Sequence, residues 1–267
     1  MISFLSIIAV GFFLGMRHAT DPDHVIAVTT IVSRQRNLLR AAVTGIVWGI
    51  GHTLTIFIVG SAIILFDVVI PARIGLSMEF SVGLMLIVLG AMNVVSFTRT
   101  ARTITPPDDE AATLHSHPHI HDDYVHMHAH GHSPETHLHT HQTPLTWLDR
   151  LCGKIGFYQQ LRPLVVGIVH GLAGSAAVAL LILTTIRDPH LALVYLLVFG
   201  AGTVGGMMLI TMSIASAFRF FGSRHANFSH WLGFASGLLS LAFGLFLAYQ
   251  IGFANGLFSG HPQWTPH

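Results

Sequence analysis

Charged residues are scarce in this sequence, cysteine is nearly absent, and one common energy-coupling motif is missing. Asp, Glu, Lys and Arg make up 9% of the 267 residues and hydrophobic residues make up 52%, whereas soluble domains carry about 25% charged residues. The single cysteine, Cys152, excludes an internal disulfide. No G-x-x-x-x-G-K-[ST] loop is present, so we expect no ATP hydrolysis by this chain. The composition predicts an integral membrane protein.

Six apolar stretches are long enough to cross a bilayer, which takes about 20 residues in a helix. They cover roughly residues 2–32, 41–66, 75–97, 162–186, 191–217 and 231–253. The expected fold is an all-α integral membrane protein with six transmembrane helices. Residues 1–97 would form one three-helix repeat, 98–160 a hydrophilic loop, 161–255 a second three-helix repeat, and 256–267 a short tail. No signal peptide is expected, because no positively charged segment precedes the first apolar stretch.

Basic residues are distributed unevenly among the predicted loops. Those in the first, third and fifth loops are Arg34, Arg36, Arg40, Arg99, Arg102, Arg150, Lys154, Arg162, Arg219 and Arg224, whereas the second and fourth hold only Arg73 and Arg187. Cytoplasmic loops carry the excess of basic residues in membrane proteins. The odd-numbered loops, including residues 98–160, are therefore predicted to be cytoplasmic, and both termini are predicted to lie outside.

A cluster of ionisable residues, His18, Asp21, Asp23 and His24, interrupts the first apolar stretch. Such groups at membrane depth are energetically costly and usually functional. Pro22 has no amide hydrogen, which predicts a helix broken at this motif, with Asp21 as the N-cap of the second half and Pro22 in its first turn. On an unbroken helix His18 and His24 would point about 120° apart. The break allows them to meet.

His18, Asp23 and His24 are predicted to bind one cation, with Asp21 and the exposed backbone carbonyls of the break as further ligands. Imidazole nitrogen combined with carboxylate oxygen suits nickel, cobalt or zinc. The alternative is a purely structural cluster, in which Arg17 pairs with one of the carboxylates and holds the helices together.

His52 in the second stretch and His170 in the fourth are further candidate metal ligands. Counted from the predicted cytoplasmic ends, His24, His52 and His170 lie roughly 8 to 11 residues deep, about 12–17 Å at helical rise. Histidines at the same depth in the membrane predict a shared metal site. The alternative is that each histidine only packs between helices, with its ring nitrogens hydrogen-bonded.

The second half of the sequence repeats features of the first. Gly15–His18 aligns with Gly167–His170, Trp48–His52 with Phe199–Thr203, and Gly83–Gly90 with Gly237–Gly244, at offsets of 152, 151 and 154 residues. Because three spans is an odd number, the two halves should be inverted relative to each other, as in many transporters, with the substrate site near the midplane between them. The second half lacks the carboxylates of the first and keeps one histidine, His170, so the site should lie closer to the first two spans.

Eleven histidines fall within the hydrophilic segment 98–160. They are His115, His117, His119, His121, His126, His128, His130, His132, His137, His139 and His141. A tract with so little apolar content is predicted to be disordered. It is interpreted as an accessory, multi-site chelator of transition metal at the cytoplasmic mouth, whose deletion should leave transport intact; the alternative is a solvating linker.

The residues His18, Asp23 and His24 match the H-x4-D-H signature of the nickel/cobalt transporter family. Together with Trp-Gly-Ile-Gly-His-Thr around His52, the motif resembles the urease-associated permease branch of that family. Pro22 stands where the family usually has alanine, and six spans replace the eight of larger members. The resemblance implies a secondary transporter of Ni²⁺ or Co²⁺ in a prokaryotic plasma membrane, with the signature histidines and aspartate essential for transport.

Uptake of Ni²⁺, Co²⁺ or both is the expected function, with the ion as substrate rather than as a prosthetic group. Efflux for metal resistance is the first alternative, because six spans with a histidine-rich loop also resemble the family's efflux branch. An intramembrane metal-dependent hydrolase is a further alternative, although no H-E-x-x-H motif is present. A metal store or sensor is the last. The expected partners are the lipid bilayer, the metal ion and a cytoplasmic metallochaperone, with no nucleic acid; the oligomeric state stays open.

Overall fold

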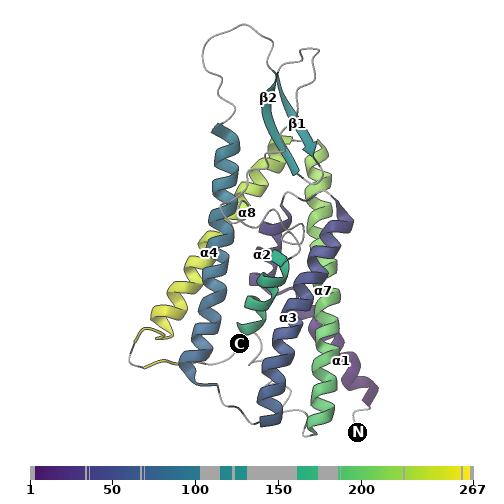
Figure 1. Ribbon diagram of the computed structural model, residues 1–267, viewed down its shortest axis with the longest axis vertical. Helices are drawn as coiled ribbons and strands as arrows, with labels where there is room; N and C mark the ends of the chain where they lie inside the picture. Colours follow the sequence, from purple (N-terminus) through teal and green to yellow (C-terminus); the bar gives the residue numbers. More distant parts are fainter. Residues whose placement is uncertain are drawn as a thin grey trace.

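A computed structural model describes most of the apolar part of the chain. The described residues are 4–33, 35, 37–66, 68, 70–102, 115–121, 124–130, 161–173, 186, 188–224, 226–259 and 261–264. Long helices lie side by side and form an elongated bundle, and a β-hairpin extends from one end of it (Figure 1). The N-terminus lies at the opposite end.

The first apolar stretch forms two short helices, α1 (Phe4–His18) and α2 (Pro22–Val32), as the sequence predicts. The backbone amides of Thr20 and Asp21 bond to the carbonyls of Arg17 and His18, three residues back, which ends the α-helical pattern of α1. Pro22 occupies the first turn of α2 and Asp21 its N-cap position. Pro22 cannot donate the next helical hydrogen bond, so the chain breaks at this point.

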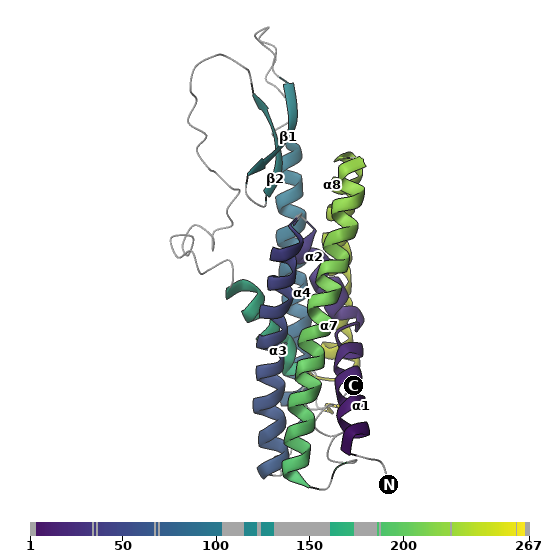
Figure 2. The ribbon, with the colours of Figure 1, turned by 90° about the vertical axis from the view of Figure 1, so that its right-hand side faces the viewer.

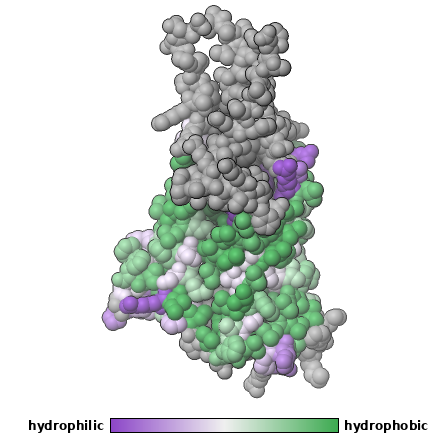
Figure 3. All heavy atoms as spheres, in the orientation of Figure 1, coloured by the Kyte–Doolittle hydropathy of each residue, from purple (hydrophilic) through white to green (hydrophobic). Residues whose placement is uncertain are grey.

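Four helices are long and apolar enough to cross a membrane. They are α3 (Leu38–Phe66), α4 (Ala72–Arg102), α7 (Pro189–Arg224) and α8 (Ala226–Tyr249), the last continuing as the π-helical turn η1 (Gln250–Ala254). A shorter apolar helix, Leu161–Ala173, begins the predicted fourth span. The rest of that span, residues 174–185, lies outside the described residues. Large hydrophobic side chains such as Phe13, Ile58 and Leu239 face outward, and hydrophobic residues cover the middle of the surface (Figure 3).

The long helices pack in pairs. α3 packs against α7, α4 against α8, and α1 against α7. Figures 1 and 2 both show α3 and α7 side by side along most of their length. We call the end of the bundle that holds Leu38 and Arg102 the hairpin end, and the end that holds Phe66 and Ala72 the opposite end.

Part of the histidine-rich segment forms two antiparallel strands, β1 (His115–His121) and β2 (Tyr124–His130). Their register places histidine opposite histidine, with His117 paired to His128 and His119 to His126. This differs from the absence of regular structure that the composition predicts. The H-x-H spacing has the two-residue period of a β-strand, which an argument from composition ignores. Four histidines of the tract, His132, His137, His139 and His141, lie outside the described residues.

The described part of the C-terminal tail folds back onto the opposite end of the bundle. The indole N–H of Trp264 donates to the Glu79 carboxylate, with 2.8 Å between Nε1 and Oε1. Trp264 also packs against Ile63 of α3. The tail therefore ties the end of the chain to α3 and α4.

Candidate metal centre

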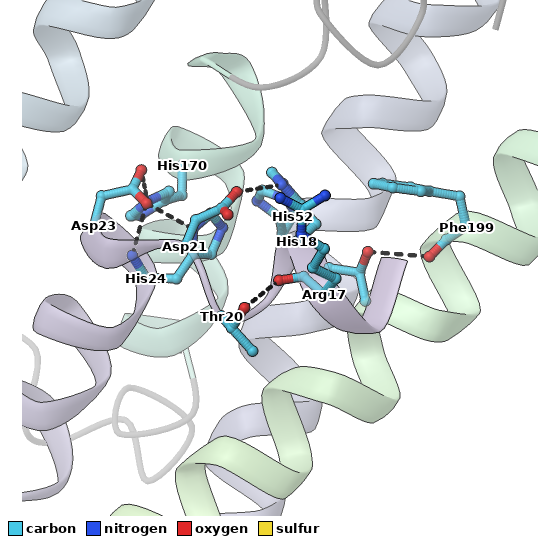
Figure 4. A network of polar contacts seen from close by, with 10 residues as sticks. Arg17, His18, Thr20, Asp21, Asp23, His24, His52, His170 and Phe199 are labelled. Atoms are coloured by element: carbon cyan, nitrogen blue, oxygen red, sulfur yellow. Dashed lines mark hydrogen bonds and ion pairs between the residues drawn. The ribbon is translucent and has the colours of Figure 1, made fainter. Parts of the chain in front are cut away.

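The predicted site residues gather where α1 and α2 meet. His18 is the last residue of α1, and Asp23 and His24 stand in the first turn of α2. His52 comes from the middle of α3, and His170 from near the end of the helix Leu161–Ala173. Figure 4 shows these side chains around the broken ends of the two short helices. Segments far apart in the sequence thus contribute to one cluster.

His24 lies at the centre of this cluster. Its ring centroid is 4.9 Å from that of His18, 5.0 Å from His52 and 4.1 Å from His170. Exposure is 2% for His24, 0% for His52 and 1% for His170. The three histidines predicted to share one depth are therefore in mutual reach and buried.

Two carboxylates hold three of the four imidazole rings. Asp23 Oδ1 lies 2.9 Å from His24 Nδ1, and Asp23 Oδ2 lies 2.9 Å from His170 Nε2. Asp21 Oδ2 lies 2.7 Å from His18 Nδ1. Asp21 stands at the N-cap position of α2 but makes no side-chain capping bond, so its carboxylate orients His18 instead.

These contacts determine which nitrogen of each neutral ring carries the proton. A carboxylate only accepts hydrogen bonds, so the nitrogen facing it must be protonated. His18 is then protonated at Nδ1 and offers the lone pair of Nε2, which lies 3.1 Å from His52 Nε2. His52 Nε2 must therefore donate, which leaves the lone pair on His52 Nδ1. By the same rule, the lone pairs of His24 and His170 lie on Nε2 and Nδ1.

Three of the four nitrogens left with lone pairs have no hydrogen-bond partner among the described residues, whereas His18 Nε2 faces His52. His24 Nε2, His52 Nδ1 and His170 Nδ1 are buried, and none has a hydrogen-bond partner among the described residues. A buried polar atom without a partner costs about 1–3 kcal/mol. Buried acceptors that face no donor among the described residues suit a cation, because a metal ion binds the lone pair of a neutral imidazole.

Two overlapping groups of ligands in this cluster have the geometry to hold a metal ion. His18, His24 and His52 form one group, and Asp23, His24 and His170 form the other. Within each group, one potential ligand atom per residue lies within 4.8 Å of the others. His24 belongs to both groups, so a single ion in this region can draw on either set.

Asp21 does not belong to either group. The alternative interpretation of its carboxylate, an ion pair with Arg17 that holds helices together, is not observed in the described part of the chain. Among the described residues, no ion pair joins Arg17 to Asp21 or Asp23, because both carboxylates face histidines. The histidine-rich strands extend from the hairpin end, away from this cluster (Figure 1). They are not part of the buried centre.

Two aromatic residues beside the centre were not selected as site residues from the sequence. The Trp48 ring stacks on His24, with 6.1 Å between centroids and 12° between planes, and lies 5.7 Å from His170. The Phe199 ring lies 5.6 Å from His18. The signal that could have found them is the repeat itself, since Trp48 and Phe199 occupy equivalent positions in the aligned segments.

The long apolar helices and the buried cluster of acceptors define the class: a multi-pass membrane protein with a candidate cation site inside its helical bundle. The sequence matches the family of high-affinity nickel-transport proteins over residues 4–215. It is 35% identical over 257 residues to the urease accessory protein UreH of Bacillus sp. (strain TB-90), covering 96% of each chain. No solved structure matches this chain.

The chain belongs to the high-affinity nickel-transport family. It is therefore a transporter rather than an enzyme, and nickel is its transported substrate rather than a prosthetic group. Membership of this family removes the intramembrane hydrolase from the alternatives. The resemblance noted in the sequence is confirmed, including the relation to a urease-associated protein.

Proposed function

We propose that this protein is a secondary permease that takes up Ni²⁺, and also Co²⁺, across a prokaryotic plasma membrane, with the ion bound at the break between α1 and α2. The observation that carries the proposal is the buried set of imidazole lone pairs at His24, His52 and His170, which lack any partner among the described residues. Nickel and cobalt accept the same nitrogen and oxygen ligands, so these donors serve both ions.

Each polar residue of the cluster has a distinct role in this proposal. His18, His24, His52 and His170 bind the ion through nitrogen. Asp23 serves as a ligand in one group and orients His24 and His170 when the ion lies in the other. Partners of this kind fix ring orientation and raise the basicity of the ligand. Asp21 acts through His18 and adds negative charge near the ion.

Two inverted three-helix halves build the transporter. A Cβ at Gly15 would overlap the carbonyl oxygen of Phe199, and a Cβ at Gly167 would overlap that of Trp48. Gly167 is the repeat equivalent of Gly15, and Trp48 that of Phe199. One contact is therefore the image of the other, which supports a two-fold relation between the halves.

The contacts between α4 and α8 show the same two-fold relation between the halves. In α4 and α8, Gly83 lies against Gly244, and Gly90 against Gly237. The repeat offset of 154 residues exchanges these two contacts, since Gly83 corresponds to Gly237 and Gly90 to Gly244. Inverted halves of this type place a substrate site near the midplane between them, which agrees with a cluster built from α2, α3 and the helix Leu161–Ala173.

Energetics favour uptake over efflux. A dication that enters a cell gains about 4.6 kcal/mol per 100 mV of inside-negative potential, twice the value for a single charge. Inward movement therefore needs no second ion, whereas export requires coupling. No ATP-binding loop is present in the sequence to supply that coupling.

The direction is tested by expressing the chain in cells whose own nickel uptake has been deleted. Uptake predicts more radiolabelled nickel in the cells at submicromolar supply and greater sensitivity to excess metal, with a His24→Ala variant as the inactive control. Lower accumulation with increased resistance would instead assign the protein to efflux. The same assay with radiolabelled cobalt measures the preference between the two ions.

The proposed orientation places both termini outside and residues 98–160, with their histidines, in the cytoplasm. Cysteines introduced at Ile70 and at Gln142, the latter outside the described residues, test it in a Cys152→Ser background. An impermeant thiol reagent should label Ile70→Cys in intact cells and Gln142→Cys only after permeabilisation. Labelling of Gln142→Cys from outside would invert the orientation and with it the role of the histidine tract as a cytoplasmic chelator.

A further inference from the structure

We infer that Trp48 and Phe199 are the two gates of the ion site, one on each side of it along the bundle axis. The inference rests on the proposed permease function and deepens it, because alternating access requires a barrier on either side of a central site. Both side chains are buried, at 0% and 2% exposure, and both touch histidines of the cluster.

The register between α3 and α7 establishes the axial levels. Gly49 faces Val204, and Thr53 faces Gly200. A step of four residues toward the C-terminus of α3 matches a step of four residues toward the N-terminus of α7. The two helices therefore run antiparallel, and each position of α3 has a partner position on α7. Every residue of one helix can be assigned a level on the other.

By this pairing, Phe199 is level with Leu54 of α3. Trp48 lies six residues from that level toward the hairpin end, about 9 Å at 1.5 Å per residue. Along α3, His52 falls between the levels of Trp48 and Phe199. The centre is thus bounded by Trp48 toward the hairpin end and by Phe199 toward the opposite end.

Each ring covers a histidine that comes from the other half of the chain. Trp48 lies 5.7 Å from His170 and Phe199 lies 5.6 Å from His18, centroid to centroid. The repeat offsets exchange these two contacts, as they exchange the backbone contacts of Gly15 and Gly167. Figure 4 shows Phe199 beside the histidine cluster. A two-fold axis in the membrane plane relates Trp48 on one side of the site to Phe199 on the other. A second gate must lie on that other side.

The surroundings of both rings suit a gate. Trp48 packs in an apolar cluster with Val28 and Met207, and Phe199 packs in another with Ile56 and Leu196. Apolar constrictions exclude hydrated ions by dewetting. The Trp48 indole N–H has no hydrogen-bond partner among the described residues, so rotation of the ring breaks no hydrogen bond there.

Side-specific labelling of a cysteine between the rings tests the inference. His52→Cys in the Cys152→Ser background supplies the thiol, and an impermeant methanethiosulfonate reagent is added to right-side-out or inside-out vesicles holding the full chain. The parent should label slowly from both sides. Phe199→Ala should raise labelling at least about tenfold from the side facing the opposite end only, and Trp48→Ala by a similar factor from the side facing the hairpin end only.

Matched variants separate gating from general loosening. Phe97→Ala removes a buried ring that packs against Gly233, between α4 and α8, and should leave labelling unchanged. Phe199→Tyr retains a ring and should stay slow. Where an alanine variant fails to reach the membrane, Phe199→Leu and Trp48→Leu remove the ring while filling most of its volume. Acceleration from the same side by both gate variants, from neither side, or equally by Phe97→Ala would overturn the inference.

Nickel uptake by the unmodified chain is measured in parallel, because the labelling assay does not depend on transport. Uptake without side-specific labelling would overturn the gates and leave the permease intact. Side-specific labelling without uptake would overturn the proposed permease and leave the two rings as barriers around the site.

Discussion

Substitution of Asp23 by asparagine removes the group that orients two of the four histidines. The carboxylate accepts one N–H from His24 Nδ1 and another from His170 Nε2, each at 2.9 Å. An amide offers only one oxygen, so its NH₂ group must face one of these nitrogens. That histidine then either loses its bond or shifts its proton to the nitrogen that should bind the ion.

The magnitude follows from the bonds that change. Hydrogen bonds to charged groups contribute about 1.5–3 kcal/mol each, and both bonds of Asp23 to imidazole rings are altered. A loss of about 2.8 kcal/mol corresponds to about 100-fold in affinity, at 1.4 kcal/mol per tenfold. We therefore expect Asp23→Asn to weaken cobalt and nickel binding by about two orders of magnitude and to lower uptake in proportion.

The assay is a titration of purified full-length protein with Co²⁺, followed by its visible absorption, with Ni²⁺ as competitor. Asp188→Asn is the matched control, because Asp188 is exposed and accepts the backbone amide of His190 at the start of α7. It removes the same charge away from the site. Affinity at the level of the unmodified protein in a folded Asp23→Asn variant would refute the role assigned to the carboxylate.

Three further outcomes are expected. His18→Ala and His24→Ala should each abolish nickel accumulation while the protein remains in the membrane, and wild-type uptake at matched expression would remove them from the site. Deletion of residues 115–141 should leave the uptake rate unchanged and lower the metal retained by isolated membranes; loss of uptake would instead favour a metal store. Gly15→Ala should lower the melting temperature in detergent, because its Cβ would overlap a backbone carbonyl, whereas Gly205→Ala meets nothing within 4 Å and should be neutral or gain up to about 1 kcal/mol.

Local chemistry made several features of the fold predictable. Pro22 lacks an amide hydrogen wherever it stands, so the break between α1 and α2 could be expected without knowing any neighbour. Long apolar stretches likewise indicated α3, α4, α7 and α8, since burial of the backbone in lipid requires helices. The hairpin could not be expected from composition, because its cause is the alternation of histidine along residues 115–130 and the pairing of two strands.

The candidate site was predictable as a set of residues but not as a geometry. His18, Asp23, His24, His52 and His170 stood out because polar groups are costly at membrane depth. Their assignment to two groups that share His24 depends on distances between separate segments, since His18 and His52 are 34 residues apart and Asp23 and His170 are 147 apart. The position of Asp21 shows the difference: its residue type suggested a helix cap or a metal ligand, and its observed partner is the His18 ring.

The sequence by itself determined that the chain is a membrane protein, where its first helix breaks and which side chains are candidate metal ligands. These features follow from local composition and from the covalent structure of proline and histidine. Only the tertiary structure decided which nitrogen of each histidine is left with a lone pair, because that depends on the carboxylate or imidazole that lies opposite. It also decided that Trp48 and Phe199 lie on either side of the cluster, since an axial level exists only once α3 and α7 are packed together.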